Sequence, residues 1–402
     1  MSPIRFAKRL VDSNELPWML PVWPWRSESE KKFRRLRMRG RALLRSQLVA
    51  RQGWGFTVSQ SLVWPAMAVL KAVLAVRKAQ LGLGEKIRLL GSFCWIQWIH
   101  NISISNQQQL MLARRGHAGE GSRHIICREH QALLELAMTR MWGYEGIHEK
   151  QTFARFGLEN GLPTVKSVAE GEGATILTEM ESWPLVDLFL KPSNLGKGVG
   201  AERLYYRKDQ GAWYSRDEVR VERAGFPAYV MGRLGGESWV LQPALKNAES
   251  WAGFTTGALV TARIVTVREG AEIRCFQACV RLPRRGSVVD NLSAGGLASE
   301  IDRETGRLAG AMGYFDNLRS YAVHPDTGAQ IEGLILPGWP EMKALVFKAH
   351  EAAGNWLAVG WDVTWTEEGA LLIEANLNWA ILPLGPMDQG DYIRMMAGAQ
   401  IS

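Results

Sequence analysis

Cysteine is scarce in this sequence: there are four in 402 residues, with neither CxxC spacing nor the paired cysteine and histidine spacing of a zinc site. A disulfide framework and a structural zinc site are therefore excluded as the basis of the fold. Such cysteine usage fits a reducing compartment. Residues 1–9 contain no apolar run and no small-residue cleavage site, so we expect a cytoplasmic protein, with a membrane-peripheral location as the alternative.

Long apolar runs are also missing. The most hydrophobic run in the N-terminal part, residues 62–76, has 15 residues and contains Pro65 and Lys71. A membrane-spanning helix needs roughly 20 apolar residues, so a span is excluded here. We interpret this run as a buried helix, with peripheral membrane contact as the alternative.

Positive charge is concentrated at one end of the chain. The net charge is +8, while residues 1–51 contain thirteen basic and four acidic residues, so the remainder is close to neutral. We expect residues 1 to about 50 to contact an anionic surface or to hold an acidic substrate. The alternative is that their tryptophans and leucines complete the core. Nucleic acid is not expected as a partner, because the nearby aromatic residues lie among prolines without an RNA-binding consensus.

Residues 360–376 have the pattern of a β-hairpin closed at Glu367-Glu368-Gly369. A three-residue loop would place Thr366 opposite Ala370. Asp362 would then lie opposite Glu374, and Asn376 would project from the same face. Facing carboxylates destabilise a strand pair, whereas an all-oxygen set of this kind suits Mg²⁺. The alternative is an ordinary hairpin with a solvated acidic face.

A second pattern joins a lysine to a glycine-rich loop. Lys191 ends an apolar strand, and Gly196, Gly198 and Gly200 follow before the next strand. Backbone amides of such a loop approach phosphate oxygens closely, and the lysine adds a point charge. A strand rather than a helix follows the loop, which excludes the Rossmann and P-loop fingerprints. The alternative is a plain turn.

From residue 164 onwards, short strands alternate with turns that contain glycine. We predict strands at 175–180, 187–191, 202–206, 238–242, 260–267 and 273–282, and helices at 129–142, 149–160 and 341–359. Residues 92–101 suit either a strand or a short helix. Strands grouped apart from helices indicate an α+β fold rather than a doubly wound parallel sheet.

These motifs, in this order and spacing, resemble the ATP-grasp superfamily. The motifs 261–266, Asp290-Asn291 with Gly295-Gly296, and Gly360-Trp361-Asp362 are similar to its sugar-transfer-associated branch, which is related to α-L-glutamate ligases. The resemblance covers about residues 128–381. It implies two α+β subdomains that clasp ATP, at 166–250 with the glycine loop and at 251–402 with the hairpin. They would follow a basic, helical extension at 1–90 and an entry module at 91–165.

The resemblance also implies roles for individual residues. Lys150 and Lys191 match the two phosphate-contacting lysines, and Glu249 stands at the position of a ribose-binding carboxylate. Asp362, Glu374 and Asn376 match ligands of two Mg²⁺ ions, with Mn²⁺ as a substitute. The connector that contacts adenine through its backbone would be Gln242, Pro243, Ala244 and Leu245.

One position departs from the resemblance. Ligases of the D-alanine:D-alanine type have an arginine two residues before the metal aspartate, where this chain has Gly360. A cation that stabilises the transition state would have to come from elsewhere, and Arg263 is the first candidate and Arg281 the second.

The implied reaction is ADP-forming ligation, in which a carboxylate becomes an acyl phosphate and then an amide with an amine. Sugar acids, amino sugars and amino acids are the expected substrate classes. Such chemistry needs no side-chain nucleophile, and we expect His148, His324 and His350 to be structural. The alternatives are thioester formation and a kinase that phosphorylates a hydroxyl. The sequence predicts no oligomeric state.

Overall fold

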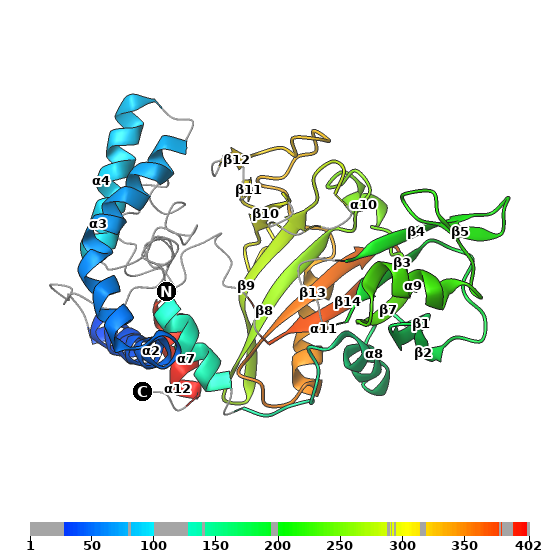
Figure 1. The fold of residues 1–402 in the computed structure, drawn as a ribbon, viewed down its shortest axis with the longest axis horizontal. Coiled ribbons are helices and arrows are strands. Elements are labelled where there is room, and N and C mark those ends of the chain that lie inside the picture. Colours follow the sequence, from blue (N-terminus) through cyan, green and yellow to red (C-terminus); the bar gives the residue numbers. More distant parts are fainter. Residues whose placement is uncertain are drawn as a thin grey trace. The chain divides into compact units, whose positions relative to one another are not determined.

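The computed structural model describes residues 28–78, 82–99, 128–138, 141–193, 200–287, 290, 292, 295–313, 319–377, 379 and 389–399. The chain forms two compact units (Figure 1). Residues 142–315 and 319–379 make up the larger unit, which contains every strand of the described residues. The smaller unit is formed by residues 1–141, 316–318 and 380–402. Gly196, Gly198 and most of the N-terminal arm lie outside the described residues.

The described part of the smaller unit is helical. Its described helices are α2 (Glu28–Gln52), α3 (Trp54–Lys78), α4 (Leu83–Ile99), α7 (Arg128–Met138) and α12 (Gln389–Gly398). The helix α2 packs against α7 and α12, and Phe33 meets Tyr392 edge to face there. The helices α3 and α4 pack on each other through Ala72, Val76, Leu89 and Phe93. No described helix is long and apolar enough to cross a membrane.

Two predictions change in this unit. Residues 92–99 belong to helix α4, which settles the choice between strand and helix. The run 62–76 is helical as predicted, but it is not a buried helix, because 78% of Leu62 is exposed and Leu70, Val73 and Leu74 are exposed too. Apolar periodicity alone does not tell a buried helix from one with an uncovered apolar face, and this explains the error.

The larger unit contains two antiparallel sheets of seven strands each. The first has the order β2-β1-β7-β3-β4-β5-β6 and the second β12-β11-β10-β9-β8-β13-β14. The strands of the first are β1 (Ala169–Glu172), β2 (Thr175–Glu179), β3 (Leu188–Pro192), β4 (Glu202–Arg207), β5 (Ala212–Tyr214), β6 (Arg220–Val221) and β7 (Ser238–Pro243). Those of the second are β8 (Thr261–Glu269), β9 (Glu272–Leu282), β10 (Leu297–Glu300), β11 (Ala311–Gly313), β12 (Ser320–Tyr321), β13 (Ala358–Thr366) and β14 (Gly369–Asn376).

Four helices accompany these sheets: α8 (Lys150–Glu159), α9 (Phe226–Leu234), α10 (Glu249–Ala252) and α11 (Trp339–Ala352). The helix α11 ends seven residues before the predicted limit of 359, and Gly354, with φ of +92°, follows its end. The chain then enters strand β13. This segregation of helices and antiparallel sheets is the expected α+β fold.

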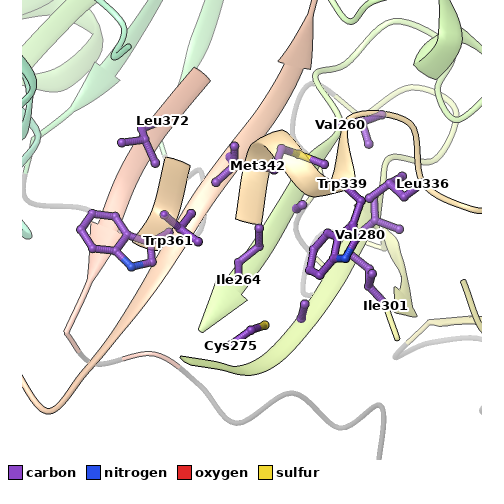
Figure 2. Packing of buried hydrophobic residues seen from close by; sticks show 14 of the residues in the cluster. Val260, Ile264, Cys275, Val280, Ile301, Leu336, Trp339, Met342, Trp361 and Leu372 are labelled. Atoms are coloured by element: carbon purple, nitrogen blue, oxygen red, sulfur yellow. The ribbon is translucent and has the colours of Figure 1, made fainter. Parts of the chain in front are cut away.

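The largest core lies between the second sheet and α11. Figure 2 shows its side chains converging from four elements: Ile264 of β8, Cys275 and Val280 of β9, Trp361 of β13, and Trp339 and Met342 of α11. Cys275 and Cys279 are buried and form no disulfide. This packing gives β8, β9 and β13 a rigid backing on one face. The opposite face of the same strands carries the charged residues described next.

Candidate active site

The hairpin of β13 and β14 places its polar side chains by an irregular register. Thr366 lies opposite Gly369, not Ala370 as predicted, so the turn is one residue shorter than expected. A bulge between Asp362 and Val363 then inserts one extra residue on β14. The two differences cancel. Asp362 lies opposite Glu374, as predicted, and Asn376 lies two residues further on the same strand.

Asp362 does not stand alone against Glu374, because two arginines hold it. Arg263 is its cross-strand neighbour on β8 and donates from Nε and Nη2 to both carboxylate oxygens. Arg281, from β9, donates from Nη2 to Oδ2 of Asp362 at 2.6 Å. Arg263 also lies 3.8 Å from a carboxylate oxygen of Glu374. The like-charge contact predicted from the sequence is therefore compensated by guanidinium groups from neighbouring strands.

Arg281 is held in turn by a buried pair of polar residues. Its Nε and Nη2 donate to the hydroxyl of Thr261 at 3.0 and 2.6 Å. That hydroxyl donates to Asp290, whose carboxylate lies 3.3 Å from Arg281 Nε. A line of contacts thus runs from Asp290 through Arg281 to Asp362.

The two hairpin carboxyls have opposite ionisation behaviour. Burial alone would raise the pKa of Asp362, but the charges of Arg263 and Arg281 outweigh it and hold that pKa below its usual range. Burial also raises the pKa of Glu374, and here the neighbouring Asp362 adds to the increase. Of the two carboxyls, Glu374 is therefore the one whose negative charge is not fully compensated by neighbouring cations.

Two lysines, at the end of β3 and at the start of α8, interact electrostatically with Glu374. Burial lowers the pKa of Lys191, at the end of β3, to about 8, and Glu374 partly opposes that shift. Burial lowers the pKa of Lys150, at the start of α8, with Glu374 again opposing. Lys150 also donates to the backbone carbonyl of Ser193 at 2.9 Å. The fold thus brings both predicted lysines within electrostatic reach of the hairpin.

The donor set fits a divalent cation. Within the described residues, no three histidine, cysteine, aspartate or glutamate side chains are grouped so that they could hold a metal ion, so any cation would depend on the carboxamide as well. Asn376 donates to a carboxylate oxygen of Glu374 at 3.2 Å, which leaves its own amide oxygen as an acceptor. Asp362 accepts three guanidinium bonds, and a carboxylate offers about four acceptor positions. Glu374, Asn376 and one position on Asp362 therefore suit an oxygen-ligated ion such as Mg²⁺, which retains several waters.

The predicted adenine connector begins in strand β7 and continues past its end. The side chain of Gln242 donates to the carbonyl of Val165 at 3.3 Å, and the N–H of Ala244 donates to the carbonyl of Asp187 at 2.8 Å. Pro243 has no N–H. Among the described residues, nothing accepts a backbone hydrogen bond from Leu245, so its N–H is the connector donor that a base could use.

The predicted ribose contact and the predicted glycine loop are described next. Glu249 is exposed at the start of α10, where its N–H donates to the Glu367 carboxylate at 2.5 Å. Gly200 has a φ of +74° and packs closely on Pro192. The roles of Glu249, Gly196, Gly198 and Gly200 stay predictions.

Sequence reasoning missed the structural partners of the arginines. Asp290 was recognised only as part of a motif, and Thr261 was not given a role. The signal for Thr261 and Arg263 was available, since alternate residues of a strand share a face and Arg263 pairs with Asp362. Nothing local marks Asp290, because its partners Thr261 and Arg281 lie 29 and nine residues away, on strands β8 and β9.

Comparisons with known proteins give one family. A family model described as sugar-transfer associated ATP-grasp matches residues 147–389. A search of curated proteins finds no match. Similar solved structures include VanG D-Ala:D-Ser ligase from Enterococcus faecalis, with 11% identity, a TM-score of 0.35, and coverage of 63% of this chain and 61% of that one.

Two further structures are of comparable similarity. L-amino acid ligase from Bacillus licheniformis has 13% identity and a TM-score of 0.33, with coverage of 66% of this chain and 52% of that one. N5-carboxyaminoimidazole synthase from Aspergillus clavatus, in complex with ADP and 5-aminoimidazole ribonucleotide, has 12% identity and a TM-score of 0.32. It is covered over 45% of its length, against 58% of this chain. The chain thus spans about half the length of the solved structures that it matches.

Proposed function

The chain belongs to the sugar-transfer associated ATP-grasp family, and from this membership we propose that it is an ADP-forming ligase joining a carboxylate to an amine. ATP-grasp enzymes are mostly ligases of this kind. The observation that supports the proposal is the convergence of Lys150 and Lys191, from one part of the unit, with Asp362 and Glu374 of the hairpin. A phosphoryl-transfer site needs cationic side chains that bind the phosphates and oxygen ligands that bind a metal ion.

Each group of residues has a separate task. The N–H of Leu245 contacts adenine, and Lys150 and Lys191 neutralise phosphate oxygens in a site that excludes much of the water. Glu374, Asn376 and Asp362 hold the divalent cation, Mg²⁺ or its substitute Mn²⁺, which supplies charge neutralisation at the phosphates when bound. Arg263 has one terminal nitrogen, Nη1, that makes no hydrogen bond with the described residues. That nitrogen is our candidate for the contact with the transferred phosphoryl group.

The reaction has two steps. A carboxylate oxygen of the substrate attacks the γ-phosphorus of ATP, a new O–P bond forms, and the bond to the bridging oxygen breaks with release of ADP. The nitrogen of the amine then attacks the acyl carbon. A C–N bond forms, the C–O bond to phosphate breaks, and the nitrogen loses a proton as phosphate leaves.

We assign Arg263 a role in both steps. Its anchoring on Asp362 fixes the guanidinium before substrates arrive, so stabilising negative charge requires little reorganisation. It thereby takes the role that an arginine at position 360 would have. A β-carbon on Gly360 would lie 3.4 Å from the side chain of Arg263 and 2.7 Å from that of Trp379, so the space is already filled.

Product analysis tests this function. The full chain is incubated with Mg-ATP and pooled sugar acids, amino sugars, amino acids and amines, and products are identified by mass spectrometry. A ligase releases ADP fully only when carboxylate and amine are both present, and its product has the mass of the two less one water. A product that gains one phosphate group on a single hydroxyl acceptor would assign a kinase instead, and a thiol as second substrate would assign a thioester-forming ligase. Glu374→Gln serves as the inactive control.

A further inference from the structure

Helix α3 carries an uncovered apolar ridge. At 3.6 residues per turn, one side of this helix, about 120° wide, carries apolar residues that are all exposed. They are Val58, Leu62, Ala66, Leu70 and Val73. The helix α4, packed beside it, adds Leu83 and Ile87, of which Leu83 is 77% exposed. Soluble surfaces seldom leave so many large apolar side chains together, and such a ridge marks an interaction surface.

Basic residues are concentrated in the helix that carries this ridge and in the helices next to it in the sequence. The helices α2, α3 and α4 contain fourteen basic and three acidic residues, a surplus of eleven that exceeds the net charge of the whole chain. Lys32, Arg35 and Arg39 of α2 are exposed, and so are Arg77 and Arg88 at the neighbouring ends of α3 and α4. Within α3 the first charged residue is Lys71, so the apolar ridge is uninterrupted over most of its length.

We propose that α3 and α4 dock on an anionic lipid surface, with the apolar ridge immersed at the level of the headgroups. An apolar helix face together with basic residues is the pattern of helices that lie in the plane of a membrane. Anionic headgroups attract the basic residues, and the ridge supplies the apolar contact. Because no described helix is able to span a bilayer, the contact is peripheral.

The charge favours lipid over a second copy of the chain. Two ridges facing each other in a dimer would bring two sets of basic helices together, and like charges at an interface oppose association. An anionic bilayer attracts the same basic helices. The proposal differs from the role predicted for residues 1 to about 50, since it assigns the apolar contact to residues 54–87. It is independent of the reaction that the larger unit catalyses.

Vesicle flotation of the full chain tests the proposal. The vesicles contain phosphatidylcholine with or without phosphatidylglycerol. The ridge variant is Leu62→Glu with Leu70→Glu. The matched control, Leu158→Glu with Leu177→Glu, makes the same change of charge at two exposed leucines of the larger unit. Circular dichroism checks that all three proteins retain their helices.

We expect the parent and the control to float with phosphatidylglycerol vesicles and to bind more weakly in high salt. The ridge variant should bind at least roughly tenfold more weakly at every ionic strength, because it loses apolar contact and gains negative charge. A parent that does not float at any ionic strength would overturn the proposal, as would a ridge variant that floats like the parent. A dimeric parent and a monomeric ridge variant, without flotation, would assign the ridge to a second copy.

Discussion

Asp362 and Glu374 face each other, but their surroundings give them opposite effects on stability. Asp362→Asn removes the charge that holds two guanidinium groups and leaves Arg281 buried with less compensation. Breaking a buried ion pair by neutralising one partner costs about 3 kcal/mol or more. Glu374→Gln removes the neighbouring like charge, so we expect stability equal to or above that of the parent. Denaturant titration without metal measures both.

Both substitutions should abolish Mg-ATP turnover, since each removes an oxygen ligand from the candidate cation site. The two variants should therefore differ in stability but share the loss of activity. Similar losses of stability in both variants, with turnover retained, would contradict the assignment of the hairpin as the metal site.

Asp290 provides a second prediction for a single residue. It contacts Thr261 and Arg281 and reaches Asp362 only through them, so we class it as a positioning residue. Asp290→Asn should lower kcat roughly tenfold with little change in KM for ATP, as for residues that orient metal ligands. Asp326→Asn is the matched control, because Asp326 pairs with Arg284 outside this network. A large rise in KM with unchanged kcat would indicate direct contact with the nucleotide instead.

Helix α11 is joined to the second sheet by a buried histidine, which makes the stability of this element sensitive to pH. The imidazole of His350 accepts from the hydroxyl of Thr266 at 2.6 Å and donates to the carbonyl of Trp356 at 2.8 Å. Burial lowers the pKa of His350 to about 4. Because the folded pKa lies below the unfolded value, the neutral histidine stabilises the fold above about pH 6.5. That stability is lost as the pH falls towards 4.

We therefore expect the free energy of unfolding to decrease between about pH 6.5 and pH 4, by up to about 3 kcal/mol from this residue. His350→Gln should be less stable than the parent at pH 7.5 and should have a shallower pH dependence over that interval. Urea titrations at several pH values measure both. Parallel pH profiles for parent and variant would show that another group is responsible.

The hairpin explains which features of an element a sequence reveals. The facing of Asp362 and Glu374 was predictable because strand side chains alternate and the turn is marked by Glu367, Glu368 and Gly369. The turn length and the bulge were not, and the prediction succeeded only because the two deviations cancel. A bulge is determined by packing on both faces of the sheet, which no local pattern records.

Helix α3 shows a feature that was predicted wrongly, namely the burial of its apolar residues. Its apolar spacing indicated a helix correctly, but whether Leu62 and Leu70 are covered depends on which elements pack against them. The arginine contacts have the same dependence. Arg263 and Arg281 were candidates for a catalytic cation because of their charge, whereas their anchoring on Asp362 follows from the adjacency of β8, β9 and β13.

On the scale of the whole molecule, the two compact units divide the chain's properties. The lysines and carboxylates of the candidate active site belong to the larger unit, while the basic helices and the apolar ridge belong to the smaller one. The boundaries predicted for four domains stay a prediction, although each sheet of the larger unit falls within one of the predicted subdomains. The proposed catalysis and the proposed surface attachment can therefore be tested separately in one intact protein.

Ligand binding should stabilise these units unequally. A ligand present at 100 times its Kd stabilises the folded state by about 2.7 kcal/mol. In hydrogen exchange of the full chain, Mg-ADP should protect amides of β3, β7, β13 and β14 and leave those of α3 and α4 unchanged. Lys191→Ala should lose this protection at the same nucleotide concentration, because the variant has no ammonium group at the end of β3 to bind the phosphates. Arg284→Ala, at an ion pair with Asp326 outside the network of Asp362, is the control. Equal protection of Lys191→Ala and the parent would place the phosphate site elsewhere, and protection of α3 by nucleotide would contradict the separation of the two functions.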